Sequence, residues 1–223
     1  MKQGMVIAID GPSGAGKSTV ARLLAERLGY IYIDTGAMYR GIGWCAKRAG
    51  VDPLDEQALA SLCARTEVAI RKVQNELRIL VNGVDVTGEI RTPEMGMMAS
   101  TVSKSPAVRA RLLIFQRELG RNGGVVMDGR DIGTVVFPGA DVKFFLDAGA
   151  EERGKRRWLE LKANGMHIDL GQITEEIRAR DRQDTERAIA PLRRAEDAFL
   201  IDSSCMTIDA VVQKMLTVVS ERT

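Results

Sequence analysis

The stretch that most constrains the fold is the glycine-rich segment GPSGAGKST, residues 11–19. It follows MVIAID, a short apolar run rich in β-branched residues that predicts a buried parallel strand. It precedes VARLLAERL, whose apolar spacing predicts a helix. Strand, glycine-rich turn and helix in this order fit a phosphate-binding loop, whose backbone N–H groups point into one concavity at a helix N-terminus. We therefore expect the chain to bind a nucleoside triphosphate.

The residues of this loop have distinct expected roles. The glycines let the backbone bend around the phosphates, Lys17 reaches the β and γ phosphates, and the Ser18 hydroxyl can bind Mg²⁺. The expected ATP-binding residues are Gly11, Pro12, Ser13, Gly14, Ala15, Gly16, Lys17, Ser18 and Thr19.

Strands and helices are expected to alternate along the rest of the chain. Apolar strands are predicted at 30–34, 124–128, 142–147 and 198–202, and helices at 37–50, 55–64, 92–103, 106–120, 151–164, 170–188 and from 207 onward. Such alternation predicts an α/β fold with a parallel sheet covered by helices on both faces. The length of 223 residues suits a single domain with room for an insertion.

The insertion is predicted at about residues 66–90, where three short segments alternate in polarity with period two. They are separated by QN and NG, and NG is a strong hairpin signal. We therefore expect a small antiparallel β subdomain here.

Composition excludes several classes of protein. A formal charge of +2 and 4% aromatic residues argue against nucleic-acid binding. The three cysteines form neither a metal-ligand pattern nor a disulfide framework, which favours a reducing cytoplasm. No apolar run approaches the roughly 20 residues needed to cross a membrane. His167 is the only histidine, in a predicted surface loop, so histidine-based catalysis has little support.

Polar residues follow the predicted strands where ligands bind in open α/β sheets, at the carboxyl ends. The second strand leads into DTGAMYR, with Thr35 and Arg40. Another leads into DGRDIG, in which Asp128 is placed to orient Mg²⁺ or, alternatively, to cap a turn, and Arg130 is a candidate anion ligand.

The charged run RARDRQDTER, residues 178–187, divides into two faces of a helix. At roughly 100° per residue, Arg180, Asp184 and Arg187 continue the inward stripe of the preceding isoleucines, while the other charges point outward. Inward charges need partners. Either an internal salt bridge or a bound phosphorylated ligand accounts for them, and one aspartate cannot neutralise two arginines.

The preceding helix carries EERGKRRW, in which Arg153 and Arg157 share a face. It is either a solvated basic helix or a mobile cover that brings positive charge to a triphosphate and excludes water.

The chemical class of the phosphoryl acceptor can be inferred from the lack of a histidine that could act as general base. A phosphate monoester has a second pKa of about 6, so it is already anionic at neutral pH and needs only positioning and charge neutralisation. An arginine-rich site therefore favours a monophosphate acceptor over an alcohol.

Together, IDGPSGAGKST, DTGAMYR, GEIRT, DGRDIGTVVFP and RDRQDTERAIAPL resemble bacterial cytidylate kinases, which are nucleoside monophosphate kinases of the phosphate-loop type, over nearly the whole chain. The resemblance implies transfer of the γ-phosphoryl group of ATP to CMP or dCMP, with Mg²⁺, by a monomeric cytoplasmic enzyme without nucleic-acid or membrane partners. It also implies an acceptor-binding region at 36–105 and a helical lid at 150–168.

The resemblance further implies a role for individual residues. Lys17, Arg130, Arg153 and Arg157 would be catalytic, with the last two in the lid, and Ser18 and Asp128 would hold Mg²⁺, partly through water. The acceptor would be bound by Thr35, Arg40, Ser100, Arg109, Arg130, Asp131, Arg180, Asp184 and Arg187. Ser100, Arg109 and Asp131 would read cytosine, Arg180 and Asp184 the ribose, and the other arginines the phosphate.

Two alternatives stay open at this point. One is a kinase of another small acceptor, such as a different nucleoside monophosphate, shikimate or dephospho-coenzyme A. The other is a slowly hydrolysing nucleotide switch, although the sequence has no guanine-reading Asn-Lys-x-Asp stretch.

Overall fold

The computed structural model describes residues 4–73, 76–163, 165–166 and 168–222. The chain divides into two compact units: unit 1 comprises Met1–Ile33 and Gly120–Thr223, and unit 2 comprises Asp34–Leu119.

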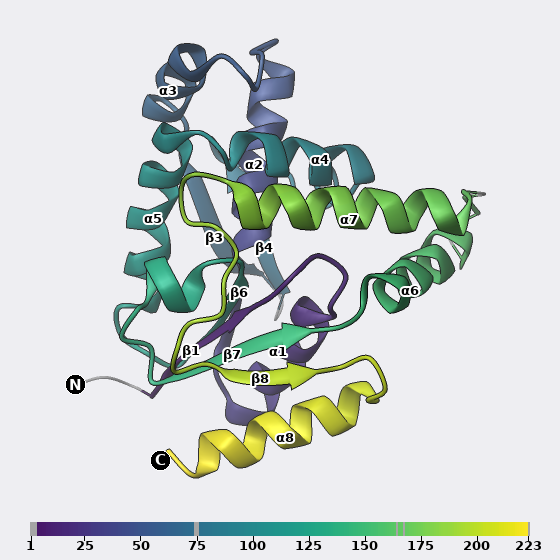
Figure 1. The fold of residues 1–223 in the computed structure, drawn as a ribbon. Helices are drawn as coiled ribbons and strands as arrows, with labels where there is room; N and C mark the ends of the chain where they lie inside the picture. The colour runs from purple at the N-terminus through teal and green to yellow at the C-terminus, as the bar shows by residue number, and fades with distance from the viewer. Residues whose placement is uncertain (1–3, 74–75, 164, 167, 223) are drawn as a thin grey trace. The chain divides into compact units, whose positions relative to one another are not determined.

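Unit 1 is built on a five-stranded parallel sheet with the strand order β2-β6-β1-β7-β8 (Figure 1). Its strands are β1 (Val6–Asp10), β2 (Ile31–Asp34), β6 (Val125–Gly129), β7 (Val142–Asp147) and β8 (Phe199–Asp202). In the register of the central strands, Ile9 pairs with Asp128 on one side and with Phe144 on the other. The carboxyl ends of the strands that precede the phosphate loop and the DGRD segment therefore lie side by side.

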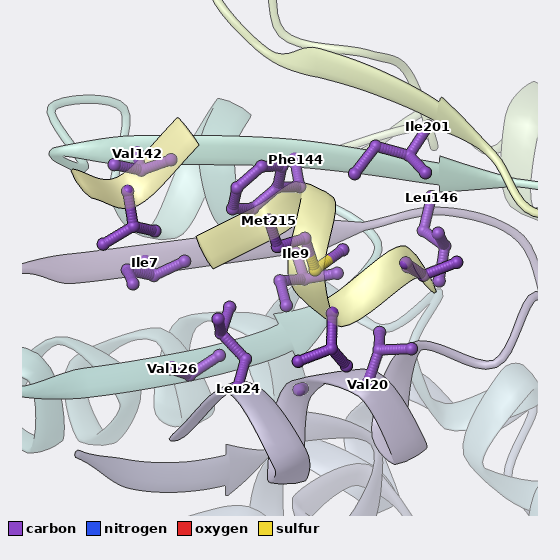
Figure 2. Packing of buried hydrophobic residues seen from close by; sticks show 14 of the residues in the cluster. Ile7, Ile9, Val20, Leu24, Val126, Val142, Phe144, Leu146, Ile201 and Met215 are labelled. Carbon is purple, nitrogen blue, oxygen red and sulfur yellow. The ribbon is translucent and has the colours of Figure 1, made fainter. Parts of the chain in front are cut away.

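The core of unit 1 lies between this sheet and two helices, α1 (Lys17–Leu28) and α8 (Ile208–Ser220). Leu24 of α1 and Met215 of α8 pack against Ile9 and Phe144 of the sheet (Figure 2). All four side chains are almost completely buried. Burial of each contributes roughly 1.5–3 kcal/mol relative to exposure.

The opposite face of β1 contacts a short π-helix, η1 (Ile132–Val136). Side chains alternate along a strand, so Asp10 points away from Ile9 and toward η1. Its two carboxylate oxygens accept hydrogen bonds from the backbone N–H groups of Ile132 and Gly133, at 2.8 and 2.7 Å. Asp10 thus links β1, which precedes the phosphate loop, to η1, which follows Arg130.

Two further helices of unit 1, α6 (Ala150–Ala163) and α7 (Leu170–Glu186), pack against each other through Leu161, Ile173 and Ile177. The expected inward isoleucine stripe of α7 is therefore confirmed. The helix is shorter than predicted, because Arg187 has an extended backbone (φ −60°, ψ 139°). Arg187 therefore follows the helix instead of extending its inward stripe.

Unit 2 contains the helices α2 (Thr35–Arg48), α3 (Glu56–Ala64), α4 (Pro93–Val102) and most of α5 (Pro106–Gly120). Asp34 caps α2 by accepting a hydrogen bond from the backbone N–H of Ala37 at 2.9 Å. Pro93 and the capping Thr92 start α4 where the sequence predicts it.

The predicted antiparallel insertion is present as β3 (Val68–Val73), β4 (Glu76–Val81) and β5 (Val84–Asp85). Asn82 and Gly83 both have positive φ angles, of 50° and 80°, as the NG hairpin signal requires. The third strand is shorter than expected, because Asp85 accepts hydrogen bonds from both the backbone and the hydroxyl of Thr87. Beyond Asp85 the contact with β4 is irregular: the Val86 N–H donates to the carbonyl oxygen of Ile79 at 3.0 Å, and the Ile79 N–H donates to the Thr87 hydroxyl at 2.9 Å.

The predicted fold class, a helix-flanked parallel sheet with a small antiparallel insertion, is confirmed. Within the described ranges, the structure holds no helix that is both long and apolar enough to cross a bilayer.

Candidate active site

The phosphate loop connects β1 to α1 in unit 1. Gly11, Gly14 and Gly16 have positive φ angles, of 148°, 79° and 90°, which confirms the expected bends. At Gly11 two features exclude a side chain: the positive φ angle, and the position that a Cβ atom would take, 2.0 Å from the carbonyl oxygen of Leu146. Among the described residues, no side chain caps the N-terminus of α1. The loop therefore presents a helix N-terminus suited to an anion.

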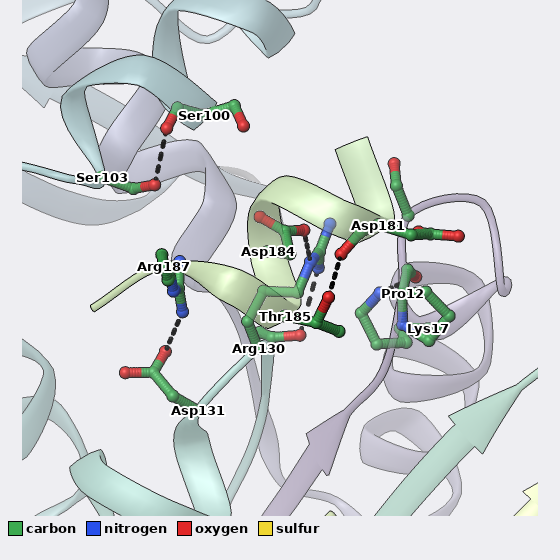
Figure 3. Close-up of polar contacts among 12 residues, drawn as sticks. Pro12, Lys17, Ser100, Ser103, Arg130, Asp131, Asp181, Asp184, Thr185 and Arg187 are labelled. Atoms are coloured by element: carbon green, nitrogen blue, oxygen red, sulfur yellow. Dashed lines mark hydrogen bonds and ion pairs between the residues drawn. The ribbon is translucent and has the colours of Figure 1, made fainter. Parts of the chain in front are cut away.

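Lys17 is buried and folds back on its own loop, with Nζ donating a hydrogen bond to the carbonyl oxygen of Pro12 at 2.6 Å (Figure 3). Burial, followed by repulsion from Arg130, lowers the pKa of Lys17 from 10.5 to about 7, although Asp128 and Asp184 oppose this fall. A phosphate group near Nζ would favour the charged form. Binding of a nucleotide would therefore be coupled to protonation of Lys17.

Asp128, at the end of β6, lies next to the loop. The Ser18 hydroxyl donates to its Oδ2 atom at 2.9 Å, and the Tyr32 hydroxyl donates to its Oδ1 atom at 3.0 Å. Hydroxyl and carboxylate oxygens are hard ligands of the kind that Mg²⁺ prefers, often together with substrate phosphates and water. The pair Ser18 and Asp128 therefore fits the expected metal. The role of Tyr32 is not predicted by the sequence patterns.

Arg130 follows β6 and pairs with Asp184 of α7. Its Nε atom lies 2.9 Å from Oδ2 of Asp184, and Nη1 donates to the carbonyl oxygen of Gly129 at 3.1 Å (Figure 3). Burial by itself would raise the pKa of Asp184, but the positive charges of Arg130, Arg180 and Arg187 outweigh it, so the pKa is lowered. The Asp184 carboxylate is therefore ionised and feels the charge of three guanidinium groups.

Asp131 and Arg187 form a second ion pair, with 3.7 Å between Oδ1 and Nη2 (Figure 3). Both side chains are nearly buried. The Nε atom of Arg187 also donates to the carbonyl oxygen of Ala190 at 2.7 Å, which fixes the turn after α7. Unit 1 thus brings Arg130, Asp131, Asp184 and Arg187 together, although Arg187 arrives from a turn and not from a helix face.

Arg153, an expected lid residue, is 4% exposed. It makes two hydrogen bonds to the carboxylate of Asp181, at 3.1 and 2.6 Å, and donates to the carbonyl oxygens of Ala148 and Ser13. Arg153 therefore links α6 and α7 to the phosphate loop. Sequence periodicity missed Asp181, because its partner lies on another helix.

Arg157, the second expected lid residue, is about one-third exposed and pairs with Glu160 on the same helix at 2.7 Å. The outer charges of α7 behave as predicted, since Arg178 pairs with Glu151 and Glu175, and Arg182 is exposed. His167 falls outside the described residues.

Unit 2 carries the remaining predicted residues. Thr35 is buried at the start of α2, and Arg40 pairs with Asp34 at 2.7 Å. Arg109 lies over the ring of Tyr39, 5.9 Å from its centroid.

Arg109 also donates to the carbonyl oxygen of Ser103 at 3.3 Å, and the Ser103 hydroxyl donates to that of Ser100 at 2.8 Å (Figure 3). Ser100 and Arg109, from different helices, are therefore linked through Ser103. Neither Ser103 nor Tyr39 is singled out by the sequence. The expectation that Arg40, Arg130 and Arg180 all bind the acceptor stays a prediction.

Known proteins resemble this chain over its whole length. The family model described as cytidylate kinase matches residues 7–221. A cytidylate kinase of Syntrophotalea carbinolica is 55% identical over 100% of this chain and 94% of that protein, and one of Geobacter sulfurreducens is 52% identical over 99% and 95%.

Among solved structures, a shikimate kinase from Acinetobacter baumannii in complex with shikimate matches with a TM-score of 0.50. It is 18% identical, over 99% of this chain and 95% of that one, and supports the fold alone. The matched range 7–221 includes the whole phosphate loop, the antiparallel insertion and α7. This chain belongs to the cytidylate kinase family.

Proposed function

We propose that this enzyme transfers the γ-phosphoryl group of ATP to CMP or dCMP, giving ADP and CDP or dCDP. The observation that carries the proposal is the match to the cytidylate kinase family over residues 7–221. The cationic cluster of Lys17, Arg130 and Arg187 supplies the matching chemistry, because the reaction brings two anionic nucleotides together.

ATP would lie with its phosphates in the loop 11–19. Backbone N–H groups at the start of α1 bind the β and γ phosphates, and Lys17 becomes fully charged as they arrive. Bound Mg²⁺, held by Ser18 and by Asp128 partly through water, would neutralise phosphate charge. The hydrogen bond between Ser18 and Asp128 supports this assignment, because it keeps both ligands at one place.

The acceptor phosphate would be held by Arg40, Arg130 and Arg187. Its second pKa of about 6 makes it an anionic nucleophile at neutral pH, so no general base is needed. Two of these arginines already pair with carboxylates, Arg130 with Asp184 and Arg187 with Asp131, which hold the guanidinium groups in place. Arginine forks then position the attacking oxygen and offset its charge.

Other predicted residues would contact the base and the ribose of the acceptor. Asp131 can accept from the amino group of cytosine, while Ser100 and Arg109 can donate to its O2 and N3 atoms. Thr35 would help to hold the acceptor, and Arg180 and Asp184 would meet the ribose. We assign residues 36–105 to acceptor binding and 150–168 to the lid.

Arg153 and Arg157 would support the transferring group from the lid. The bond from Arg153 to the Ser13 carbonyl oxygen supports a role next to the γ phosphate, because it reaches the loop itself. Closure of such positive charge over the phosphates stabilises the transition state and excludes water.

A panel of acceptors tests the proposal. With MgATP as donor, we expect CMP and dCMP to be phosphorylated with higher kcat/KM than UMP, AMP, shikimate or dephospho-coenzyme A. Equal rates with UMP or AMP would contradict the assignment, and ATP hydrolysis that no acceptor accelerates would favour a nucleotide switch. Lys17→Ala should abolish transfer while the circular dichroism spectrum stays unchanged.

We further propose that the enzyme is a monomer in the cytoplasm and acts on free nucleotides without nucleic-acid or membrane partners. The unpaired thiols of Cys45, Cys63 and Cys205 support a reducing compartment. Light scattering coupled to size-exclusion chromatography tests the oligomeric state.

A further inference from the structure

Tyr32 is placed to control the carboxylate of Asp128. Its hydroxyl group donates to the Oδ1 atom of Asp128 at 3.0 Å, while the Ser18 hydroxyl donates to the Oδ2 atom at 2.9 Å. Two hydrogen bonds to different oxygens fix the plane of a carboxylate. Asp128 is 4% exposed, so water offers little replacement for either bond.

The sheet and the hydrophobic core hold Tyr32 in place. It lies on β2, the neighbour of β6 in the sheet, and it packs against the core cluster to which β1, β6, β7, β8, α1 and α8 contribute. The hydroxyl group therefore reaches Asp128 from a rigid strand rather than from a loop. Rigid support of this kind is what metal ligands require from the residues behind them.

We propose that Tyr32 is a positioning residue for the magnesium site, acting by orienting the Asp128 carboxylate beside Ser18. This inference rests on the proposed metal-binding role of Ser18 and Asp128. When the Ser18 oxygen serves a cation, its hydrogen still bonds to Oδ2 of Asp128, and Tyr32 holds Oδ1. Without the tyrosine hydroxyl the carboxylate gains rotational freedom that cation binding must remove.

The chain offers a matched control in Tyr30, two residues earlier. Its ring packs against the same core cluster, and its hydroxyl oxygen accepts one hydrogen bond from the backbone N–H of Met5 at 3.1 Å. Tyr30→Phe and Tyr32→Phe therefore each remove one hydroxyl group from a tyrosine that packs against the same core. Only the second loses a contact with the proposed metal site.

The test measures cation affinity directly. Mn²⁺ takes the same oxygen ligands as Mg²⁺, and its free concentration is read by electron paramagnetic resonance. Titrations would use wild type, Tyr32→Phe, Tyr30→Phe and Asp128→Asn, each saturated with a non-hydrolysable ATP analogue. We expect Tyr32→Phe to weaken Mn²⁺ binding about tenfold, the lower end of the range for residues that support metal ligands. Tyr30→Phe should match wild type.

Each outcome decides a different point. If Asp128→Asn weakens Mn²⁺ binding but Tyr32→Phe does not, the positioning role of Tyr32 is refuted while the metal site stands. If Asp128→Asn also binds Mn²⁺ like wild type, the metal assignment itself is wrong. An equal loss in Tyr30→Phe and Tyr32→Phe would show a general packing effect and overturn the inference. Unchanged nucleotide affinity in EDTA for Tyr32→Phe would support it, because its effect then requires the cation.

Discussion

Nucleotide binding to the phosphate loop should be accompanied by proton uptake, because Lys17 is only partly charged before the phosphates arrive. Burial and the charge of Arg130 lower the pKa of Lys17 from 10.5 to about 7. This corresponds to a penalty of about 5 kcal/mol on the charged form. An adjacent triphosphate favours that form and raises the pKa again.

The size of the uptake depends on pH. At pH 8 about a tenth of the free enzyme carries a charged Lys17, so MgATP binding should take up about 0.9 proton. At pH 7 about half is charged already, and the uptake should fall to about 0.5 proton. The terminal phosphate of ATP is itself ionised at both values, since its pKa is about 6.

Isothermal titration calorimetry measures this uptake without acceptor, as the slope of the observed binding enthalpy against the ionisation enthalpy of the buffer. Lys17→Arg keeps a permanent charge and Lys17→Met has none, so neither should take up the proton. Asp10, which burial raises to a pKa of about 7, could contribute instead. Asp10→Asn with intact Lys17 should therefore retain the uptake at pH 8. A zero slope in wild type, or a full slope in Lys17→Met, would refute the reasoning.

The site and the fold yield three further predictions. Arg130→Ala and Arg187→Ala should each raise the KM for CMP about 10- to 100-fold and lower kcat in steady-state kinetics, because charge-assisted hydrogen bonds are lost. Arg182→Ala, at an exposed position, serves as the neutral control. Loss of stability without a change in the KM or kcat for CMP would instead indicate a structural salt bridge. Asp10 has a folded-state pKa of about 7 against 3.8 in the unfolded chain, so its ionisation lowers the free energy of unfolding by up to about 4 kcal/mol as the pH rises through this window. Urea titrations should therefore show that the free energy of unfolding of Asp10→Asn rises relative to wild type between pH 5 and pH 8. A constant difference between the two proteins over this range would contradict the shift. Gly11→Ala should distort the phosphate loop and lower the urea midpoint of unfolding, because its Cβ atom would lie 2.0 Å from the carbonyl oxygen of Leu146. An unchanged midpoint would mean that β7 can shift to make room for the Cβ atom without loss of stability.

The sequence was most informative where a structure depends on neighbouring residues. The phosphate loop and the Asn82–Gly83 hairpin follow from local backbone conformations, and both formed as predicted. The inward isoleucines of α7 followed from helical periodicity. The same periodicity failed at Arg187, because the extended backbone there ends the helix at Glu186, two residues before its predicted end.

Local sequence patterns could not predict which side chains from distant segments pair with each other. Arg153 and Asp181 lie on different helices, and Tyr32 and Asp128 lie on different strands. Neither pair has a fixed spacing that would reveal it. The chain thus encoded by itself a phosphate loop, an α/β alternation and an excess of arginine near strand ends. Tertiary packing alone decided which carboxylate each arginine and tyrosine meets, because such contacts are set by strand order and helix packing and not by distance along the chain.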